Sequence, residues 1–319
     1  MSTVETVRGP VDVSELGTTL PHEHILIVEP EALQNWGYAY GPCYWDEEAR
    51  VADAIVRLNE VREAGIRTIV DPTAPGLGRY IPRIQRISES VDLNIVVATG
   101  LYAFLALPNF LTYRGVDSIA ELFVREIREG INDTGVKAAF LKCAVEEHGL
   151  VGDVPRILAA VAAASVETGA PVMVHTNAAA RTGFAALETL TAAGVDPARI
   201  VIAHMGDSND LEYMREVAAA GAWLGLDRFG IDHFNPTAQR IATLLALLDE
   251  GLGNRIHLSH DAACFMDFFT GNPAFANEKP GYLLITKTVV PELLAAGATQ
   301  ADIDQLMVAN PGRFLAGQP

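Results

Sequence analysis

Cysteine and basic residues are scarce in this sequence. Its 319 residues include 3 cysteines, Cys43, Cys143 and Cys264, too few for the disulfide framework of a small secreted domain, so we expect a reducing compartment. Lysine and arginine number 23 against 40 aspartates and glutamates, and the formal net charge is −17. Because such a surface repels phosphate backbones and anionic lipids, we expect no nucleic-acid or membrane partner.

Long apolar runs are also missing. No stretch approaches the roughly 18 apolar residues of a membrane-spanning helix, and the N-terminal residues lack the apolar core of a secretory signal. We therefore expect a cytoplasmic protein. Half of the chain, 50%, is hydrophobic, and its 27 glycines and 17 prolines are dispersed, which is typical of a globular enzyme rather than a disordered or collagen-like chain.

Short apolar segments alternate with amphipathic stretches along the chain. Helix starts are indicated at Asp46 and Asp153, helix ends at Gly65 and Gly169, and a capping box at Asn209 with Glu212. Eight segments are apolar at successive positions, as strands buried on both faces are. These predicted strands are Thr18–Ile25, Arg67–Asp71, Asn94–Thr99, Ala138–Cys143, Pro171–His175, Ile200–His204, Ala222–Asp227 and Arg255–Asp261.

Eight strands that alternate with helices indicate a parallel sheet with right-handed crossovers. The alternative to a closed barrel is an open doubly wound sheet, which commonly carries a phosphate loop after its first strand. Here the first strand ends in His22-Glu23-His24, and Gly76-Leu77-Gly78 lacks the third glycine of a dinucleotide fingerprint. We therefore predict an α/β fold, a (β/α)8 TIM barrel that spans residues 1–319 as a single domain.

Titratable side chains close five of the predicted strands, on the face where such barrels carry their active sites. They are His22 and His24 on the first strand, Lys142 on the fourth, His175 on the fifth, His204 on the sixth and Asp261 on the eighth. Residues two apart on a strand share a face, so His22 and His24 can reach one ion. Any single histidine here is more simply a hydrogen-bonded core residue, but the whole set indicates a metal site for Zn²⁺, Co²⁺, Fe²⁺ or Mn²⁺.

Lys142 is the unusual member of this set. A charged ammonium group at the end of an apolar strand, beside metal cations, would be electrostatically costly. One interpretation is a surface lysine whose ammonium group reaches solvent. The other is a neutral amine that takes up carbon dioxide, because the resulting carbamate is an anion able to bridge two metals.

Together these motifs resemble the phosphotriesterase family of the amidohydrolase superfamily. The resemblance lies in His22-Glu23-His24 and in the segments FLKCA, VMVHTN, IAHMGD and LSHDA around the other ligands. It implies that His22, His24 and Asp261 hold the more buried of two divalent metal ions, zinc being the first choice. It implies that His175 and His204 hold the more exposed ion, and that carboxylated Lys142 and a hydroxide bridge both. It also implies a homodimer.

The attacking group implied by this resemblance is the bridging hydroxide, which two adjacent cations generate at neutral pH. Asp261 lies beside it and can accept its proton. The rival from another class, a metal-binding scaffold without catalysis, is disfavoured because both Lys142 and Asp261 are present.

Two further positions bear on the substrate. Arg228 in GLDRFG and Tyr102 in ATGLY resemble the phosphotriesterase-like lactonases, whereas the family's organophosphate hydrolases carry His and Trp there. The Tyr102 hydroxyl can bond a lactone carbonyl or the hydroxide. The simpler alternatives are packing for Tyr102 and an ion pair with Asp227 or Asp207 for Arg228.

We therefore predict a binuclear metallohydrolase that acts on a small-molecule substrate. It opens lactones, with N-acyl homoserine lactones as candidates, and has promiscuous phosphotriesterase activity. The alternative is an organophosphate triesterase or another ester or amide hydrolase on the same metal site.

Aromatic residues gather near the predicted mouth of the barrel. The segment 262–282 contains Phe265, Phe268, Phe269 and Phe275, which either pack over the barrel or at a dimer interface, or line an apolar channel for an acyl chain. The segment 35–45 is also aromatic. We assign no role to His148, His233, His257 and His260, and expect His260 to face away from the barrel lumen because it alternates with Asp261.

Overall fold

The computed structural model describes residues 2–41, 44–268 and 281–318. Within these ranges, none of the helices combines the length and the apolar character that crossing a bilayer requires.

Eight parallel strands form the centre of the molecule. In chain order they are β3 (Thr19–Leu20), β5 (Thr68–Asp71), β6 (Asn94–Gly100), β7 (Phe140–Val145), β8 (Val172–Thr176), β9 (Ile200–Ile202), β10 (Trp223–Leu226) and β11 (Ile256–Leu258). Each strand pairs with the next along the chain. Across the seam between β3 and β11, the Asp261 amide donates to the His22 carbonyl at 3.1 Å and the His24 amide to the Ala262 carbonyl at 2.8 Å. The predicted (β/α)8 barrel is confirmed.

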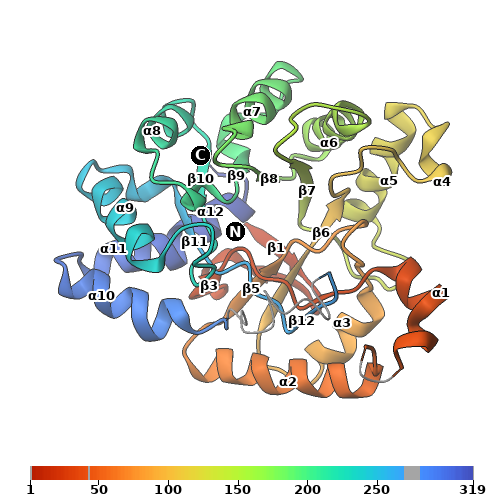
Figure 1. The fold of residues 1–319 in the computed structure, drawn as a ribbon, viewed down its shortest axis with the longest axis horizontal. Coiled ribbons are helices and arrows are strands. Elements are labelled where there is room, and N and C mark those ends of the chain that lie inside the picture. Colours follow the sequence, from red (N-terminus) through yellow and green to blue (C-terminus); the bar gives the residue numbers. More distant parts are fainter. Residues whose placement is uncertain (1, 42–43, 269–280, 319) are drawn as a thin grey trace.

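Helices surround the strands as a ring (Figure 1). They are α1 (Pro30–Tyr40), α2 (Glu47–Glu63), α3 (Ile81–Ser88), α4 (Asn109–Thr112), α5 (Val116–Arg128), α6 (Val154–Thr168), α7 (Thr182–Ala192), α8 (Leu211–Ala219), α9 (Thr237–Asp249), α10 (Val290–Ala295), α11 (Gln300–Asp304) and α12 (Asn310–Leu315). Asp46 caps α2 by accepting from the Ala49 amide at 3.1 Å, and Gly169 ends α6 in the left-handed conformation. Both of these helix boundaries agree with the sequence prediction.

The capping box predicted at Asn209 is wrong by one residue. Asp210 is the N-cap of α8, and its carboxylate accepts from the Tyr213 amide at 3.1 Å. The Asn209 side chain bonds Gln239, Asn235 and Thr243 instead. A tertiary network therefore outweighs the local capping preference of Asn209.

The first predicted strand, Thr18–Ile25, is also wrong in its extent. The ladder ends at Leu20, and the following residues bond both to β5 and to the segment after β11. Ser259 Oγ accepts from the His22 amide at 3.0 Å, and the Val70 carbonyl accepts from the Glu23 amide at 2.9 Å. The chain then forms β4 (Leu26–Ile27), which pairs in parallel with β12 (Phe265–Met266).

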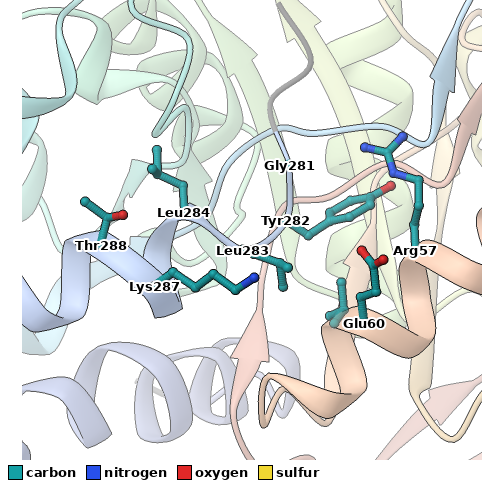
Figure 2. Close-up of a pocket in the computed structure, with 9 residues that line it drawn as sticks. Arg57, Glu60, Gly281, Tyr282, Leu283, Leu284, Lys287 and Thr288 are labelled. Carbon is teal, nitrogen blue, oxygen red and sulfur yellow. The ribbon is translucent and has the colours of Figure 1, made fainter.

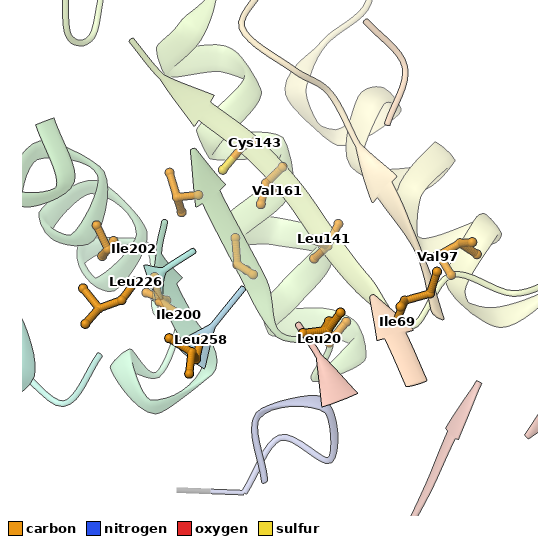
Figure 3. Packing of buried hydrophobic residues seen from close by; sticks show 14 of the residues in the cluster. Leu20, Ile69, Val97, Leu141, Cys143, Val161, Ile200, Ile202, Leu226 and Leu258 are labelled. Atoms are coloured by element: carbon orange, nitrogen blue, oxygen red, sulfur yellow. The ribbon is translucent and has the colours of Figure 1, made fainter. Parts of the chain in front are cut away.

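Hydrophobic side chains pack on both faces of the strands. Figure 3 shows the outer layer, in which Leu141, Cys143 and Ile202 belong to strands and Val161 to α6. A second cluster fills the lumen and is closed by β1 (Thr3–Thr6) and α12; it includes Val4, Val70, Val96, Phe140, Met173, Trp223, Phe314 and Leu315. β1 pairs with β2 (Gly9–Asp12) in an antiparallel hairpin that the sequence did not predict. This packing leaves the carboxyl ends of the strands for the functional groups.

Candidate metal centre

Every predicted metal ligand lies on a barrel strand or a few residues after one. The side chains of His22, Lys142 and His204 are buried. His22 and His204 follow β3 and β9 by two residues each, whereas Lys142 lies within β7 and not at the strand end that the sequence predicted. His24 and Asp261 come from opposite sides of the barrel seam. His175 is the most accessible histidine of the set, because it lies on β8 toward the mouth.

One ring nitrogen of each histidine is held by an acceptor outside the centre. His22 Nδ1 and His204 Nδ1 lie 2.7 and 3.0 Å from the two oxygens of Asp227. His24 Nδ1 lies 2.7 Å from Thr73 Oγ1. Such outer contacts fix the tautomer and the ring orientation of a metal-binding histidine.

The opposite ring nitrogens face one another across the centre. His22 Nε2 and His24 Nε2 lie 3.4 and 3.3 Å from Asp261 Oδ1, and His204 Nε2 lies 2.9 Å from His175 Nδ1. His22 Nε2 is buried and has no hydrogen-bond partner among the described residues. A buried ring nitrogen left in this state is an available metal ligand, so the residues present fit a cation.

A tighter group stands out among these ligands. His22, His204 and Asp261 each offer one ligand atom within 4.8 Å of the other two. The sequence resemblance divides this group, placing His22 and Asp261 on one ion and His204 on the other. The short separations mean that the two predicted subsites adjoin, which is what a shared bridging group requires.

The ionisation states suit metal binding. Burial lowers the pKa of His22, His175 and His204, which keeps the imidazoles neutral and able to ligate. Burial disfavours the charged form of Asp261, but neighbouring His22 and the permanently charged Arg228 hold the pKa of its carboxyl well below the usual value. The centre therefore combines neutral nitrogen ligands with an ionised carboxylate.

Lys142 is completely enclosed within β7. Burial lowers the pKa of its ammonium group to about 8, so a fraction of the amine is neutral near neutral pH. Gly100 on β6 packs directly against it: a Cβ at Gly100 would lie 2.0 Å from the Lys142 carbonyl oxygen. The surface-lysine interpretation is wrong, because the strand places this side chain inside the site.

Two of the predicted ligands adopt a strained backbone. His204 has a φ of 67° and Asp261 a φ of 56°, in the left-handed region that residues with a Cβ rarely occupy. The predicted eighth strand, Arg255–Asp261, is shorter in the structure and ends at Leu258. Hydrogen bonds from the His204 amide to Asp227 at 2.7 Å and from the Asp261 amide to His22 hold the two conformations.

Tyr102 and Arg228 both reach the centre. The Tyr102 hydroxyl donates to Glu146 Oε1 at 2.7 Å and lies 3.4 Å from both ring nitrogens of His175. Arg228 donates from Nε to Asp261 and from Nη1 to Asp207, each at 2.8 Å. The expected ion pair with Asp207 is therefore present, whereas Asp227 is engaged by the two histidines.

Sequence reasoning missed two carboxylates of the site. Asp227 closes the predicted strand Ala222–Asp227, and its position among the other strand ends was the signal that could have identified it. Glu146 follows β7 by one residue and carried no such signal. It contacts His175 Nε2 through Oε2 at 3.2 Å, and the bond from His175, against the opposing effect of burial, lowers the pKa of Glu146 to about 2.

Glu23, between the two predicted ligand histidines, holds the segment that follows β11. It is fully buried and accepts from the His260 amide at 2.9 Å, the Ser259 hydroxyl at 2.8 Å and the Ala262 amide at 2.9 Å. His260 faces away from the lumen, as predicted, and its Nε2 accepts from the Ile285 amide at 3.0 Å.

The other histidines lie away from the centre. His148 and His233 are exposed. His257 is 1% exposed, packs between the rings of Trp223 and Phe314, and forms no hydrogen bond from either ring nitrogen to a described residue.

The aromatic segments near the mouth pack on each other. Phe265 on β12 lies 5.6 Å from the Trp45 ring, and the Tyr44 hydroxyl donates to Asp267 at 2.7 Å. Phe268 is 47% exposed, while Phe269 and Phe275 lie outside the described residues. For Phe265 this supports the packing interpretation.

A separate cavity of about 280 Å³ lies outside the barrel, between α2 and the segment that begins at Gly281. Figure 2 shows Arg57 and Glu60 on α2 facing Tyr282. None of the predicted metal ligands lines it. The Tyr282 hydroxyl donates to the His24 carbonyl at 2.7 Å, so this residue supports the segment between β3 and β4 that carries two predicted ligands.

Comparisons with known proteins agree with this geometry. A model of the phosphotriesterase family matches residues 2–315. A phosphotriesterase homology protein from Mycobacterium tuberculosis is 43% identical over 326 aligned positions, which cover 100% of this chain and 99% of the relative. An aryldialkylphosphatase from Saccharolobus solfataricus is 36% identical, covering 97% of this chain and 98% of the relative. The solved structure of the phosphotriesterase from Mycobacterium tuberculosis matches with a TM-score of 0.93 and 42% identity over 98% of both chains.

The barrel, the candidate metal-binding group of His22, His204 and Asp261, and these relatives define a hydrolase of a metal-dependent class. Within that class, the chain belongs to the phosphotriesterase family.

Proposed function

We propose that this hydrolase opens lactones on a binuclear metal centre, with N-acyl homoserine lactones as candidate substrates and phosphotriesters as slower ones. The observation that carries the proposal is the position of Arg228, which donates to Asp261 and Asp207 at 2.8 Å each. These bonds occupy Nε and Nη1, so Nη2 is the nitrogen that remains to donate to a substrate oxygen. An arginine held in this way stabilises negative charge that develops on an ester oxygen.

The metal subsites are assigned to the residues that face the centre. His22, His24 and Asp261 would hold one ion, His175 and His204 the other, and carboxylated Lys142 would join them. Zinc is the first choice for these ligands, with Co²⁺, Fe²⁺ and Mn²⁺ as alternatives. When bound, such a pair supplies a nucleophile from water and polarises the ester oxygen.

We assign the proton transfer and the positioning to side chains of the protein itself. Asp261 has its Oδ1 toward His22 and His24 and its Oδ2 bonded to Arg228. We assign it the acceptance of the proton released when water attacks, because an ionised carboxylate at this position is a base of suitable reach. Asp207 supports it by holding Arg228 in place.

A phosphotriester as the main substrate is the second candidate. One relative at 36% identity is named an aryldialkylphosphatase, which favours it. The two candidates differ in the geometry they require, since a planar ester and a tetrahedral triester place the leaving oxygen differently relative to Arg228.

The test compares purified protein, loaded with Zn²⁺ or Co²⁺, on aliphatic lactones, N-acyl homoserine lactones and aryl dialkyl phosphates. We expect kcat/KM for at least one lactone to exceed that for the triesters. Asp261→Asn should remove both activities, whereas Asp249→Asn, on the outer helix α9, should change neither. Triester turnover equal to or above lactone turnover would overturn the lactonase proposal and support the second candidate.

A further inference from the structure

His257 is a polar side chain enclosed in the lumen of the barrel, on the strand that leads to Asp261. It is 1% exposed and packs against the rings of Trp223 and Phe314, at centroid distances of 5.2 and 5.0 Å. Neither of its ring nitrogens has a hydrogen-bond partner among the described residues. A neutral imidazole carries one donor and one acceptor nitrogen, and burying either without a partner is unfavourable.

The strand register explains where this side chain points. β10 and β11 run parallel and pair Gly225 with His257. Alternate residues of a strand share a face, and Trp223 belongs to the cluster in the lumen, so Gly225 and Asp227 lie on the lumen side of β10 as well. Because glycine has no side chain, β10 contributes none at the level of His257, one layer below Asp227.

Asp227 has an acceptor position left over. Its Oδ1 accepts from the amide and from Nδ1 of His204, at 2.7 and 3.0 Å, and its Oδ2 lies 2.7 Å from His22 Nδ1. An ionised carboxylate offers about four lone-pair sites on its two oxygens. The described residues therefore leave one site on Oδ2 unused, on a side chain that can only accept.

His257 and Asp227 are neighbours without a direct bond. Burial lowers the pKa of His257, while Asp227 and the backbone of Asn310 act in the opposite direction, so both lie near the ring. Neither ring nitrogen of His257 bonds Asp227 directly. Buried polar groups that lie beyond direct bonding distance are commonly bridged by a water molecule, which needs roughly two to four polar partners.

We propose that a buried water site lies between His257 and Asp227 Oδ2, and that His257 is a positioning residue for the metal ligands through this water. The water donates one hydrogen to Asp227 Oδ2 and meets a ring nitrogen of His257 with its second hydrogen or a lone pair. The lone pairs of Asp227 are then all engaged, which fixes the carboxylate that orients His22 and His204. The inference rests on the ligands assigned in the proposed function, but not on its lactone substrate.

A crystal structure of the metal-free protein tests the water site directly. We expect ordered density for one water at about 2.7–3.2 Å from a ring nitrogen of His257 and from Asp227 Oδ2. His257→Leu should lose this density, because the leucine side chain offers the water no polar partner. His257→Gln, which keeps a donor and an acceptor, should retain it. Wild-type crystals without a water between the two residues would overturn the inference.

The positioning role is tested by the affinity for Zn²⁺, measured by competition with a chelator. His257→Leu should weaken Zn²⁺ binding by about tenfold, the lower end of the effect of removing an outer partner of a metal ligand, because His257 acts through Asp227. His257→Gln should recover most of the affinity. A glutamine variant as weak as the leucine variant would contradict a role that depends on hydrogen bonding.

Met173→Leu is the matched control. Met173 belongs to the same cluster in the lumen and is 1% exposed, and this substitution conserves volume without removing a hydrogen-bonding nitrogen. Its affinity for Zn²⁺ should equal that of wild type. An equal loss in Met173→Leu and His257→Leu, or no loss in His257→Leu, would overturn the positioning role. Because neither readout uses a substrate, failure to hydrolyse any lactone would overturn the lactonase proposal alone.

Discussion

Arg228 Nε lies 2.8 Å from Asp261 Oδ2, so the residue we assign as the base is also bound by a permanent cation. Asp207 contacts both Arg228 and Arg240 at 2.8 Å, which extends the ion-pair chain to α9. The charge of Arg228 is therefore balanced on both sides. Its position depends on carboxylates rather than on packing alone.

Replacing Arg228 tests this ion-pair chain. Arg228→Met keeps much of the side-chain volume but leaves Asp261 and Asp207 without their shared partner. We expect kcat on lactones to fall by about 10²-fold, as when one donor to a developing charge is removed, with a smaller effect on KM. Arg215→Met, which breaks the exposed pair with Glu250, is the control and should leave kcat within about twofold because exposed pairs contribute little.

Lys142 should link metal binding to stability. We expect Lys142→Ala to lose most of the bound metal, measured by elemental analysis, and to regain part of it with acetate or propionate at millimolar concentration. Because a ligand that binds only the folded state raises the melting temperature, wild type should gain thermal stability on metal addition and Lys142→Ala should gain much less. Equal metal content in the two proteins would contradict the assignment of Lys142.

His257 should make the fold sensitive to acid. Burial lowers its pKa to about 3, against about 6.5 in the unfolded chain. Between these values the unfolded chain binds more protons than the folded one, so stability falls as pH decreases from about 6.5 toward 3. The full effect is of order 5 kcal/mol, from about 3.5 pH units at 1.36 kcal/mol each.

The measurement is urea unfolding between pH 7 and pH 4 for wild type and His257→Leu. The variant should lose less stability over this range. His148→Leu, at an exposed position, should follow the wild-type curve. Parallel curves for wild type and His257→Leu would exclude His257 as the source of the acid sensitivity.

Gly100 should tolerate no side chain. It has a φ of 115°, and an added Cβ would lie 2.0 Å from the Lys142 carbonyl oxygen. We expect Gly100→Ala to lower the free energy of unfolding by about 2 kcal/mol or more and to reduce metal content by displacing Lys142. At Gly115 the Cβ would meet nothing within 4 Å and φ is not positive, so Gly115→Ala should be nearly neutral. Similar losses in the two variants would argue against this steric explanation.

Strand cores and the ligand ring could be predicted from the sequence, because both depend on local patterns. Runs of buried apolar residues marked the eight strands, and parallel strands bring their carboxyl ends to one rim. Glu146 could not be found in this way, since its contacts are with a tyrosine that follows β6 and a histidine on β8. The predictions of a capping box at Asn209 and of a long first strand were wrong for a related reason. In both places tertiary hydrogen bonds replaced the local ones that the pattern favoured.

The seam of the barrel falls between the first and last strands, and the centre spans it. His22 and His24 lie just after the first strand of the barrel, and Asp261 lies just after the last. His22 and Ser259, which are hydrogen-bonded across the seam, are 237 residues apart in the sequence. Contacts this distant in sequence form late and at high entropic cost. A cation shared by these three side chains would therefore hold the first and last strands of the barrel together. Its loss would increase local unfolding first at the seam between β3 and β11.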